Sequence, residues 1–182
     1  MDSLFQIFKV DVEEANRIAS EANEPHRHDF EELMIGNKGV LEHFIDFDSV
    51  ETRAPFVSFV TKGKVHRVQP KPLNGECDIW VIRFKSEFIP ETTFQLYSYY
   101  HNQADLQLDC GTCFNRLILL CQMIFDENQK AVPNYAIIQQ TLNLIFTIVE
   151  GERQRINPYD EDLQKTQHIS FKNFLSILEE NY

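Results

Sequence analysis

Short apolar stretches separated by turn residues fill the first 86 residues, and this pattern limits the possible folds more than any other feature. The stretches predicted to be strands are Leu4–Lys9, Phe30–Ile35, Val40–Phe47, Phe56–Val60, Val65–Gln69 and Ile79–Phe84. Gly36–Gly39 is typical of a hairpin turn, because glycine and asparagine tolerate the positive φ that such turns need. Many short strands at close intervals favour a barrel or a sandwich over a parallel sheet.

After Ser86 the apolar residues take the spacing of helices. We expect helices over Glu91–His101, Thr112–Lys130, Asn134–Ile156 and Ile169–Asn181. The change divides the chain into a β unit over 1–86, a helical segment over 87–160, and a linker with a new helix over 161–182. The last helix is too short to be stable alone, which predicts a further domain beyond Tyr182.

The helix over Asn134–Ile156 carries an apolar row at alternating steps of three and four, which is the spacing of a coiled-coil seam. The row is Tyr135, Ile138, Leu142, Ile145 and Val149. A second row, which includes Ile137 and Leu144, lies on another face. We expect one face to pack on the β unit and the seam to form a homodimer interface. The alternative partner for the seam is the helix Thr112–Lys130 of the same chain.

The charge balance excludes several partners. Lys and Arg number 17 and Asp and Glu number 28, which gives a net charge of −11. Such a surface repels a phosphate backbone and an anionic membrane, so we expect these residues to bind neither DNA nor lipid themselves. The sequence contains no apolar run long enough to span a bilayer and no signal-like start. These features predict a cytoplasmic chain with no membrane partner.

Two cysteines have the spacing of a redox or zinc motif, because Cys110 and Cys113 form C-x-x-C. A second pair is missing, and a helix rather than a strand is expected beside the motif. We therefore expect reduced, buried thiols.

Histidines and carboxylates gather in the stretch that runs from Pro25 to Glu32. In an extended segment, His26, His28 and Glu32 project to one side, because side chains alternate. Two imidazoles and a carboxylate on one face can bind a divalent transition metal if one or two more ligands join them. His66, on a separate strand, is the expected fourth ligand.

The spacing H-x-H-x3-E-x6-G, which His26, His28, Glu32 and Gly39 complete, resembles the first cupin motif. Gly63 and His66 resemble the core of the second motif, although Thr61 and Pro70 replace its proline and asparagine. The resemblance implies a double-stranded β-helix, or jelly-roll barrel, that holds Zn, Ni, Mn or Fe through His26, His28, Glu32 and His66. A metal-free pocket is the open alternative.

A cupin unit followed by helices with a seam and a final short helix resembles the sensory half of an AraC-type bacterial transcription regulator. This resemblance implies that the barrel binds a small effector, that the helices form a homodimer, and that DNA is bound only through a C-terminal helix-turn-helix domain absent from this chain. The net charge of −11 agrees with that division of labour.

A second set of pocket residues is expected in the stretch Cys77–Ile82, where Asp78 and Trp80 share one face with Ile82. A corresponding strand in the arabinose-responsive member of the family resembles this one and places a tryptophan against the sugar. A flat ring stacks well on the C–H face of a sugar. The alternative is a tryptophan buried in the core.

Three function classes remain open from the sequence. The leading hypothesis is a non-enzymatic sensor that binds an effector through His26, His28, Glu32, His66, Asp78 and Trp80. The rival is a metal-dependent cupin enzyme, a dioxygenase or isomerase, which would need an open metal position and a nearby acid or base. A purely structural dimer module would leave the histidine cluster without a role.

Overall fold

The computed structural model describes residues 4–21, 23–45, 48–89, 104–109 and 111–156. The helices expected over Glu91–His101 and Ile169–Asn181, and the last domain boundary, lie outside these residues. The strands are β1 (Phe5–Val10), β2 (Glu31–Lys38), β3 (Val40–Ile45), β4 (Asp48–Arg53), β5 (Phe56–Val60), β6 (His66–Lys71), β7 (Asp78–Phe84) and β8 (Asp105–Gln107). The helices are α1 (Val12–Ser20), the 3-10 turn η1 (Ser86–Phe88), α3 (Thr112–Asn128) and α4 (Tyr135–Ile156).

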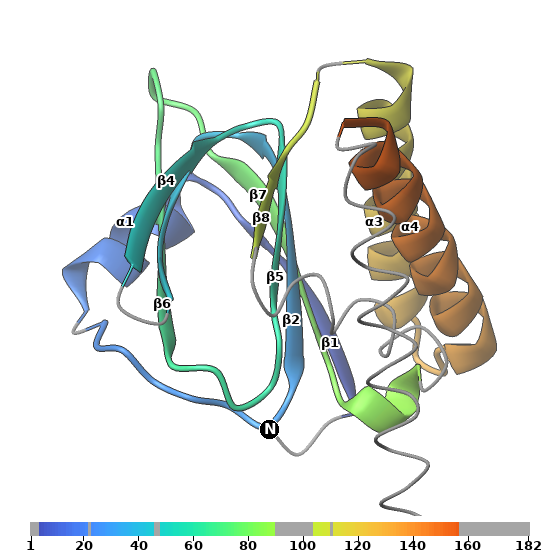
Figure 1. The fold of residues 1–182 in the computed structure, drawn as a ribbon. Coiled ribbons are helices and arrows are strands. Elements are labelled where there is room, and N and C mark those ends of the chain that lie inside the picture. The colour runs from blue at the N-terminus through green and yellow to red at the C-terminus, as the bar shows by residue number, and fades with distance from the viewer. Residues whose placement is uncertain (1–3, 22, 46–47, 90–103, 110, 157–182) are drawn as a thin grey trace, which may run out of the picture.

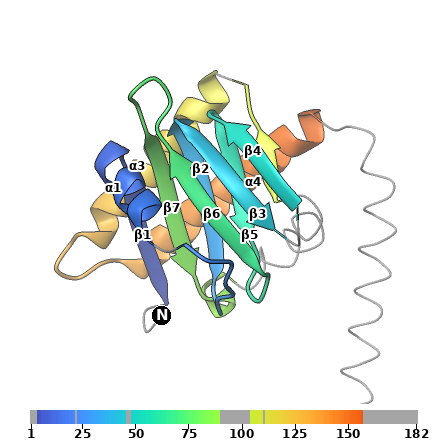
Figure 2. The same ribbon diagram turned by 90° about the vertical axis from the view of Figure 1, so that its left-hand side faces the viewer.

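The strands form two antiparallel sheets that face each other, and α3 and α4 lie together on the outer side of one of them (Figures 1 and 2). The larger sheet has the order β1-β7-β2-β5-β8, and the smaller has the order β4-β3-β6. This arrangement confirms the expected cupin-like β unit followed by helices. It differs from a complete barrel, because no ladder among the described residues joins the two sheets into a closed cylinder.

The first hairpin turns later than the sequence suggested. β2 continues through Gly36 to Lys38, and the chain reverses at Gly39, whose φ is 101°. A side chain at Gly39 would be strained by this φ and would approach the Lys71 carbonyl to 2.9 Å. β3 covers the predicted strand Val40–Phe47 as far as the described residues extend, and it pairs with β4 and β6 on its two sides.

Alternation along the central strands β2, β5 and β7 divides the core into two layers. Leu33, Phe59 and Ile82 face α3 and α4 on the outer side of the larger sheet. Met34 and Val81, one position away in each strand, face the space between the two sheets. The outer layer is therefore the core between the larger sheet and the helices. The inner layer faces the space between the two sheets.

The seam residues of α4 are a correction to the sequence interpretation. Ile138, Leu142 and Ile145 are fully buried, and Val149 is 1% exposed, all in the core formed with α3 and the larger sheet. Tyr135, the fifth member, is half exposed and contacts the Phe88 ring. The periodicity was right, but the row packs within the chain because α3 and the sheet together supply an apolar surface for it.

Apart from Tyr135, several exposed apolar side chains on the two helices belong to other rows. Leu119 and Met123 are exposed on α3, and Ile137 and Leu144 are exposed on α4. None of the described helices is both long enough and apolar enough to cross a bilayer.

The described cysteines, Cys77, Cys113 and Cys121, are free thiols. Burial raises the pKa of Cys77 to about 11 and also raises the pKa of Cys121. Cys110 lies outside the described residues, so the C-x-x-C interpretation stays a prediction.

Candidate functional site

A cavity of about 210 Å³ lies between the inner face of the larger sheet, the smaller sheet and α1. Asp11 caps α1, because its carboxylate accepts a hydrogen bond from the Glu14 backbone N–H at 2.9 Å. The segment after α1 is tied to β6 by the Asn23 amide, which donates to the Val68 carbonyl. The cavity is lined by Phe8, Val10, Glu14, Arg17, Ile18, Asn23, His26, Glu32, Met34, Leu41, Val68, Pro70, Ile79, Val81 and Arg83.

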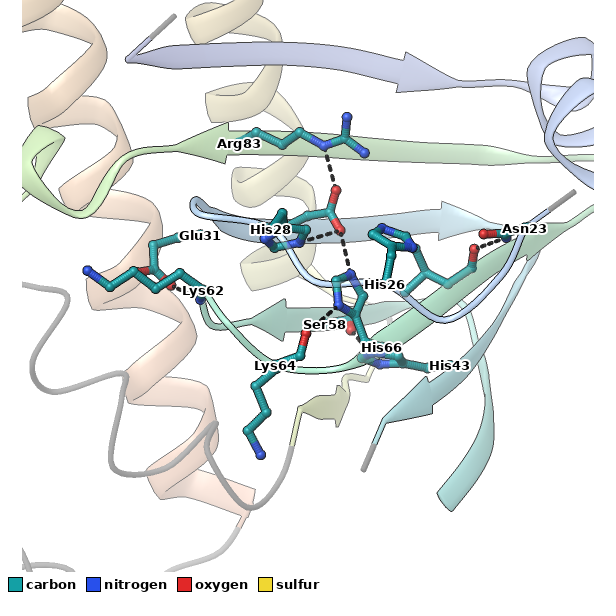
Figure 3. A network of polar contacts seen from close by, with 12 residues as sticks. Asn23, His26, His28, Glu31, His43, Ser58, Lys62, Lys64, His66 and Arg83 are labelled. Carbon is teal, nitrogen blue, oxygen red and sulfur yellow. Dashed lines mark hydrogen bonds and ion pairs between the residues drawn. The ribbon is translucent and has the colours of Figure 1, made fainter. Parts of the chain in front are cut away.

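Three of the predicted ligands meet beside this cavity (Figure 3). The Nε2 atoms of His28 and His66 each lie 3.8 Å from Oε2 of Glu32, and the ligand atoms of the three residues lie within 4.8 Å of one another. All three side chains are at most 7% exposed. Residues from three separate parts of the fold therefore form one buried cluster, which we call the histidine–glutamate cluster.

Backbone hydrogen bonds hold the cluster together. His26 and His66 exchange two backbone hydrogen bonds, and the Gly63 N–H donates to the His28 carbonyl at 2.8 Å. The Glu31 carboxylate accepts a hydrogen bond from the Lys62 N–H. The segment before β2 and the loop before β6 are thus fixed against each other, which places His28 opposite His66.

Arg83 is the fourth member of the arrangement and was not expected from the sequence. Its Nε donates to Oε1 of Glu32 at 2.6 Å. Burial alone would raise the pKa of Glu32. The two imidazoles and the Arg83 guanidinium outweigh burial and hold the pKa of this carboxyl well below its usual range. Glu32 is therefore a buried carboxylate that stays charged at neutral pH.

Several imidazole nitrogens in this region are buried and have no hydrogen-bond partner among the described residues. They are both ring nitrogens of His28 and the Nε2 atoms of His43 and His66. Buried polar atoms normally have a hydrogen-bond partner, so a group of unpaired nitrogens indicates that a ligand, ion or water binds them. The donor set of two imidazoles and a carboxylate suits a divalent transition metal. The residues of the histidine–glutamate cluster therefore fit the metal that the cupin resemblance implies.

His26 is not part of the cluster as the structure places it. Its Nδ1 lies 3.0 Å from the Glu24 carbonyl, and the side chain is exposed at the rim of the cavity. The expectation that His26, His28 and Glu32 project to one side assumed an extended strand. β2 begins only at Glu31, so the alternation of a strand does not extend back to the two histidines.

Asp78 and Trp80 do share one face, but it is the face that the helices cover. The Trp80 ring packs against Phe125 of α3, with the Lys9 ammonium 5.0 Å from its centroid. Asp78 pairs with Lys9 at 2.8 Å and accepts a hydrogen bond from Asn37. Neither residue lines this cavity, and the core interpretation of Trp80 applies. Asp78 lines a separate pocket, together with Asp11 and Lys38. On β7 the cavity is lined by Ile79, Val81 and Arg83 instead.

A second polar group that the sequence did not reveal lies between the sheets. Nδ1 of the buried His43 is 3.2 Å from both carboxylate oxygens of Asp105 and 3.3 Å from the Ser58 hydroxyl. A nucleophilic triad needs the serine and the carboxylate on opposite ring nitrogens. Here both contact the same nitrogen, so this group has the geometry of a structural hydrogen-bond network.

Comparisons with known proteins give a fold and no family. No family model matches the sequence, and no curated protein matches it. Among solved structures, ToxT from Vibrio cholerae (the K231A variant without ligand) has a TM-score of 0.51 at 14% identity, over 86% of this chain and 57% of that one. This chain shares the fold of ToxT. At that identity, the likeness establishes architecture alone.

Two further structures have TM-scores below 0.5. The AraC-like transcriptional activator CuxR gives 0.47 at 12% identity, over 81% of this chain and 48% of that one. A Cupin 2 conserved barrel domain protein from Salinispora arenicola gives 0.34 at 17% identity, over 48% of this chain and 68% of that one. The chain spans about half the length of ToxT and CuxR.

Proposed function

We propose that this chain is the effector-sensing part of a cytoplasmic AraC-type bacterial transcription regulator, and that it binds a small molecule in the cavity beside α1. The observation that carries the proposal is the cavity itself, whose walls include side chains that are otherwise completely buried. Val10, Met34, Leu41 and Ile79 are at most 2% exposed, yet they line about 210 Å³ of open space. A concave, largely apolar site with a few convergent polar groups is the usual form of a small-molecule site.

The rest of the regulator would act through other surfaces. DNA binding, in this proposal, belongs to a C-terminal helix-turn-helix domain outside these 182 residues, since the acidic chain is unsuited to phosphate contacts. Self-association would use the exposed apolar residues of the two helices, such as Leu119, Met123 and Leu144, in place of the buried seam. Exposed apolar side chains on neighbouring helices are the kind of surface that partners cover.

Ligand binding is tested by thermal and urea unfolding in the presence of a library of small metabolites. A ligand at one hundred times its dissociation constant stabilises the native state by about 2.7 kcal/mol. We expect at least one compound to do so for the wild type and to have no effect on Met34→Trp, because the larger ring fills the cavity. Met123→Trp, an equal change at an exposed site on α3, is the matched control and retains the response. Stabilisation that survives Met34→Trp would place the ligand elsewhere and contradict the proposal.

We also propose a metal at the histidine–glutamate cluster, held by His28, Glu32 and His66. When bound, a divalent ion there would supply a Lewis acid that polarises a ligand oxygen, which an effector site and the rival cupin enzyme could both use. The three unpartnered imidazole nitrogens of His28 and His66 support this proposal. Arg83 opposes it, because a guanidinium that already neutralises part of the Glu32 charge lowers the attraction for a cation.

The metal proposal can be tested residue by residue, because the ring centroid of His26 lies 4.8 Å from that of His66 while its nitrogens lie outside the set of converging ligand atoms. Protein dialysed against Zn, Ni, Mn or Fe and then against buffer is expected to retain metal by elemental analysis. His28→Ala and His66→Ala should each lower the affinity by at least about 10–100-fold, which is the loss known even for residues that only orient ligands. His26→Ala is the matched control and is expected to retain the metal. Equal losses in all three variants would restore the four-residue site, and no retained metal in the wild type would leave an organic-ligand pocket.

A further inference from the structure

The terminal nitrogens of Arg83 are held in a fixed position and have no hydrogen-bond partner in the described part of the chain. Nε is engaged by Glu32, and the guanidinium carbon lies 5.1 Å from the centroid of the Phe8 ring and 5.3 Å from that of Phe30. Figure 3 shows Nε directed at Glu32, with the two remaining nitrogens turned away from it. Aromatic contacts and one ion pair thus fix the guanidinium plane while its outer edge stays open.

The other charged groups of the cavity wall are already satisfied. Arg17 is paired with Glu14 and Glu21, both on or next to its own helix. Glu32 uses one oxygen for Arg83 and has the imidazoles of the cluster 3.8 Å from the other. The negative charge of Glu32 is therefore shared between Arg83 and the two imidazoles. Glu32 alone does not neutralise the positive charge of the Arg83 guanidinium. Of the two arginines that line the cavity, only Arg83 has both terminal nitrogens without a hydrogen-bond partner among the described residues.

The wall beyond Arg83 is apolar. Val81 and Ile79 follow it along the same face of β7, and Met34 lies next to them on β2, where it pairs with Val81. All three are at most 5% exposed. A ligand held by Arg83 can therefore place its body on an apolar strip of β7 and β2. The other polar side chains of the wall are Glu14, Arg17, Asn23, His26 and Glu32.

We propose that the cavity binds a small carboxylate with an apolar body. The carboxylate accepts two parallel hydrogen bonds from the terminal nitrogens of Arg83, a pairing that matches the planar fork of the guanidinium. The body lies on Met34, Ile79 and Val81. These three side chains offer no hydrogen-bond partner to the hydroxyls of a sugar, and they add nothing to any contact between inorganic phosphate and the guanidinium. The volume of about 210 Å³, below the usual range for drug-sized ligands, limits the body to a short chain or a single ring. This inference rests on the proposed effector binding and names the class of effector.

Calorimetric titration with matched pairs of acids and amides tests the carboxylate directly. Benzoate and hexanoate are expected to bind the full chain at least tenfold tighter than benzamide and hexanamide, and tighter than inorganic phosphate. Arg83→Lys keeps the positive charge beside Glu32, so the fold is preserved, but it loses the fork and should weaken both acids about tenfold. Arg67→Lys is the matched control: this arginine is as exposed as Arg83, pairs with Glu42 and lies outside the cavity.

The outcomes separate this inference from the function on which it rests. Acids and amides that bind equally, or acids that bind Arg83→Lys as tightly as wild type, overturn the carboxylate assignment. Phosphate that binds as tightly as the acids overturns the apolar half of it. If the acids do not bind but a neutral ligand does, and Met34→Trp abolishes its binding, the carboxylate class is wrong. The proposed effector site is then still supported. If no compound binds the cavity, both fail. Circular dichroism of each variant confirms that the fold is intact.

Discussion

Ile145→Asp is expected to destabilise the protein strongly, whereas Leu144→Asp, one residue away, leaves its stability nearly unchanged. Ile145 has no exposed surface and packs in the core shared by α4, α3 and the larger sheet. The substitution removes the burial of a large aliphatic side chain and places an unpaired carboxylate in an apolar interior, at a combined cost of more than about 4 kcal/mol. Domains of this size are stable by about 5–15 kcal/mol, so the substitution removes a large part of that margin. Urea unfolding followed by circular dichroism measures it.

Leu144→Asp is the matched control, because the same change is made where the side chain is 48% exposed. A substitution at such a site normally changes stability by less than about 0.5 kcal/mol. Sedimentation of this variant also tests the proposed dimer surface: a wild-type dimer that becomes a monomer in Leu144→Asp supports the exposed row as the interface. An Ile145→Asp protein as stable as Leu144→Asp would show that the α4 seam is not part of the core.

The seam illustrates what periodicity can and cannot predict. Steps of three and four residues correctly identified a buried stripe that includes Ile138, Leu142 and Ile145. They carry no information about the partner, because a helix face packs equally well on a second chain, on a helix or on a sheet. Here α3 and the outer face of β2 and β7 were available within the chain, and local contacts are formed before association.

Strand parity has the same limit. Asp78 and Trp80 were correctly placed on one face of β7, but alternation does not say which face meets the cavity. Charge does not decide it either, because Asp78 lies on the face that the helices cover and Arg83 on the face toward the cavity. Arg83 alternates with the apolar Val81 and Ile79, and a cation on an otherwise apolar inward face indicates a partner inside, which here is Glu32. The group around His43 could not be predicted, because β8 brings Asp105 to it from 62 residues away.

Arg83→Met is expected to destabilise the protein, and adding Glu32→Leu is expected to restore most of the loss. Glu32 is 2% exposed and charged at neutral pH, so removal of its guanidinium partner leaves a buried carboxylate with only two imidazoles beside it. Breaking a buried pair in this way costs about 3–5 kcal/mol, and the lower end applies because the Arg83 side chain is 34% exposed. Replacing both partners by apolar side chains of similar size is often neutral or stabilising, since neither charge must then be desolvated.

The double-mutant cycle therefore measures how Glu32 is neutralised. If Arg83 is the main partner, the double variant unfolds in urea within about 1 kcal/mol of wild type, and the coupling energy is about 2 kcal/mol. If His28 and His66 carry the compensating charge, Arg83→Met alone costs little and the coupling energy is near zero. The second result would also mean that Arg83 and Glu32 interact only weakly. The affinity of Arg83 for a ligand carboxylate would then not depend on its ion pair with Glu32. Glu32→Leu alone measures the change in stability when His28 and His66 lose the carboxylate. Arg83 adds little to this change, because its guanidinium can turn to solvent and no buried charge remains.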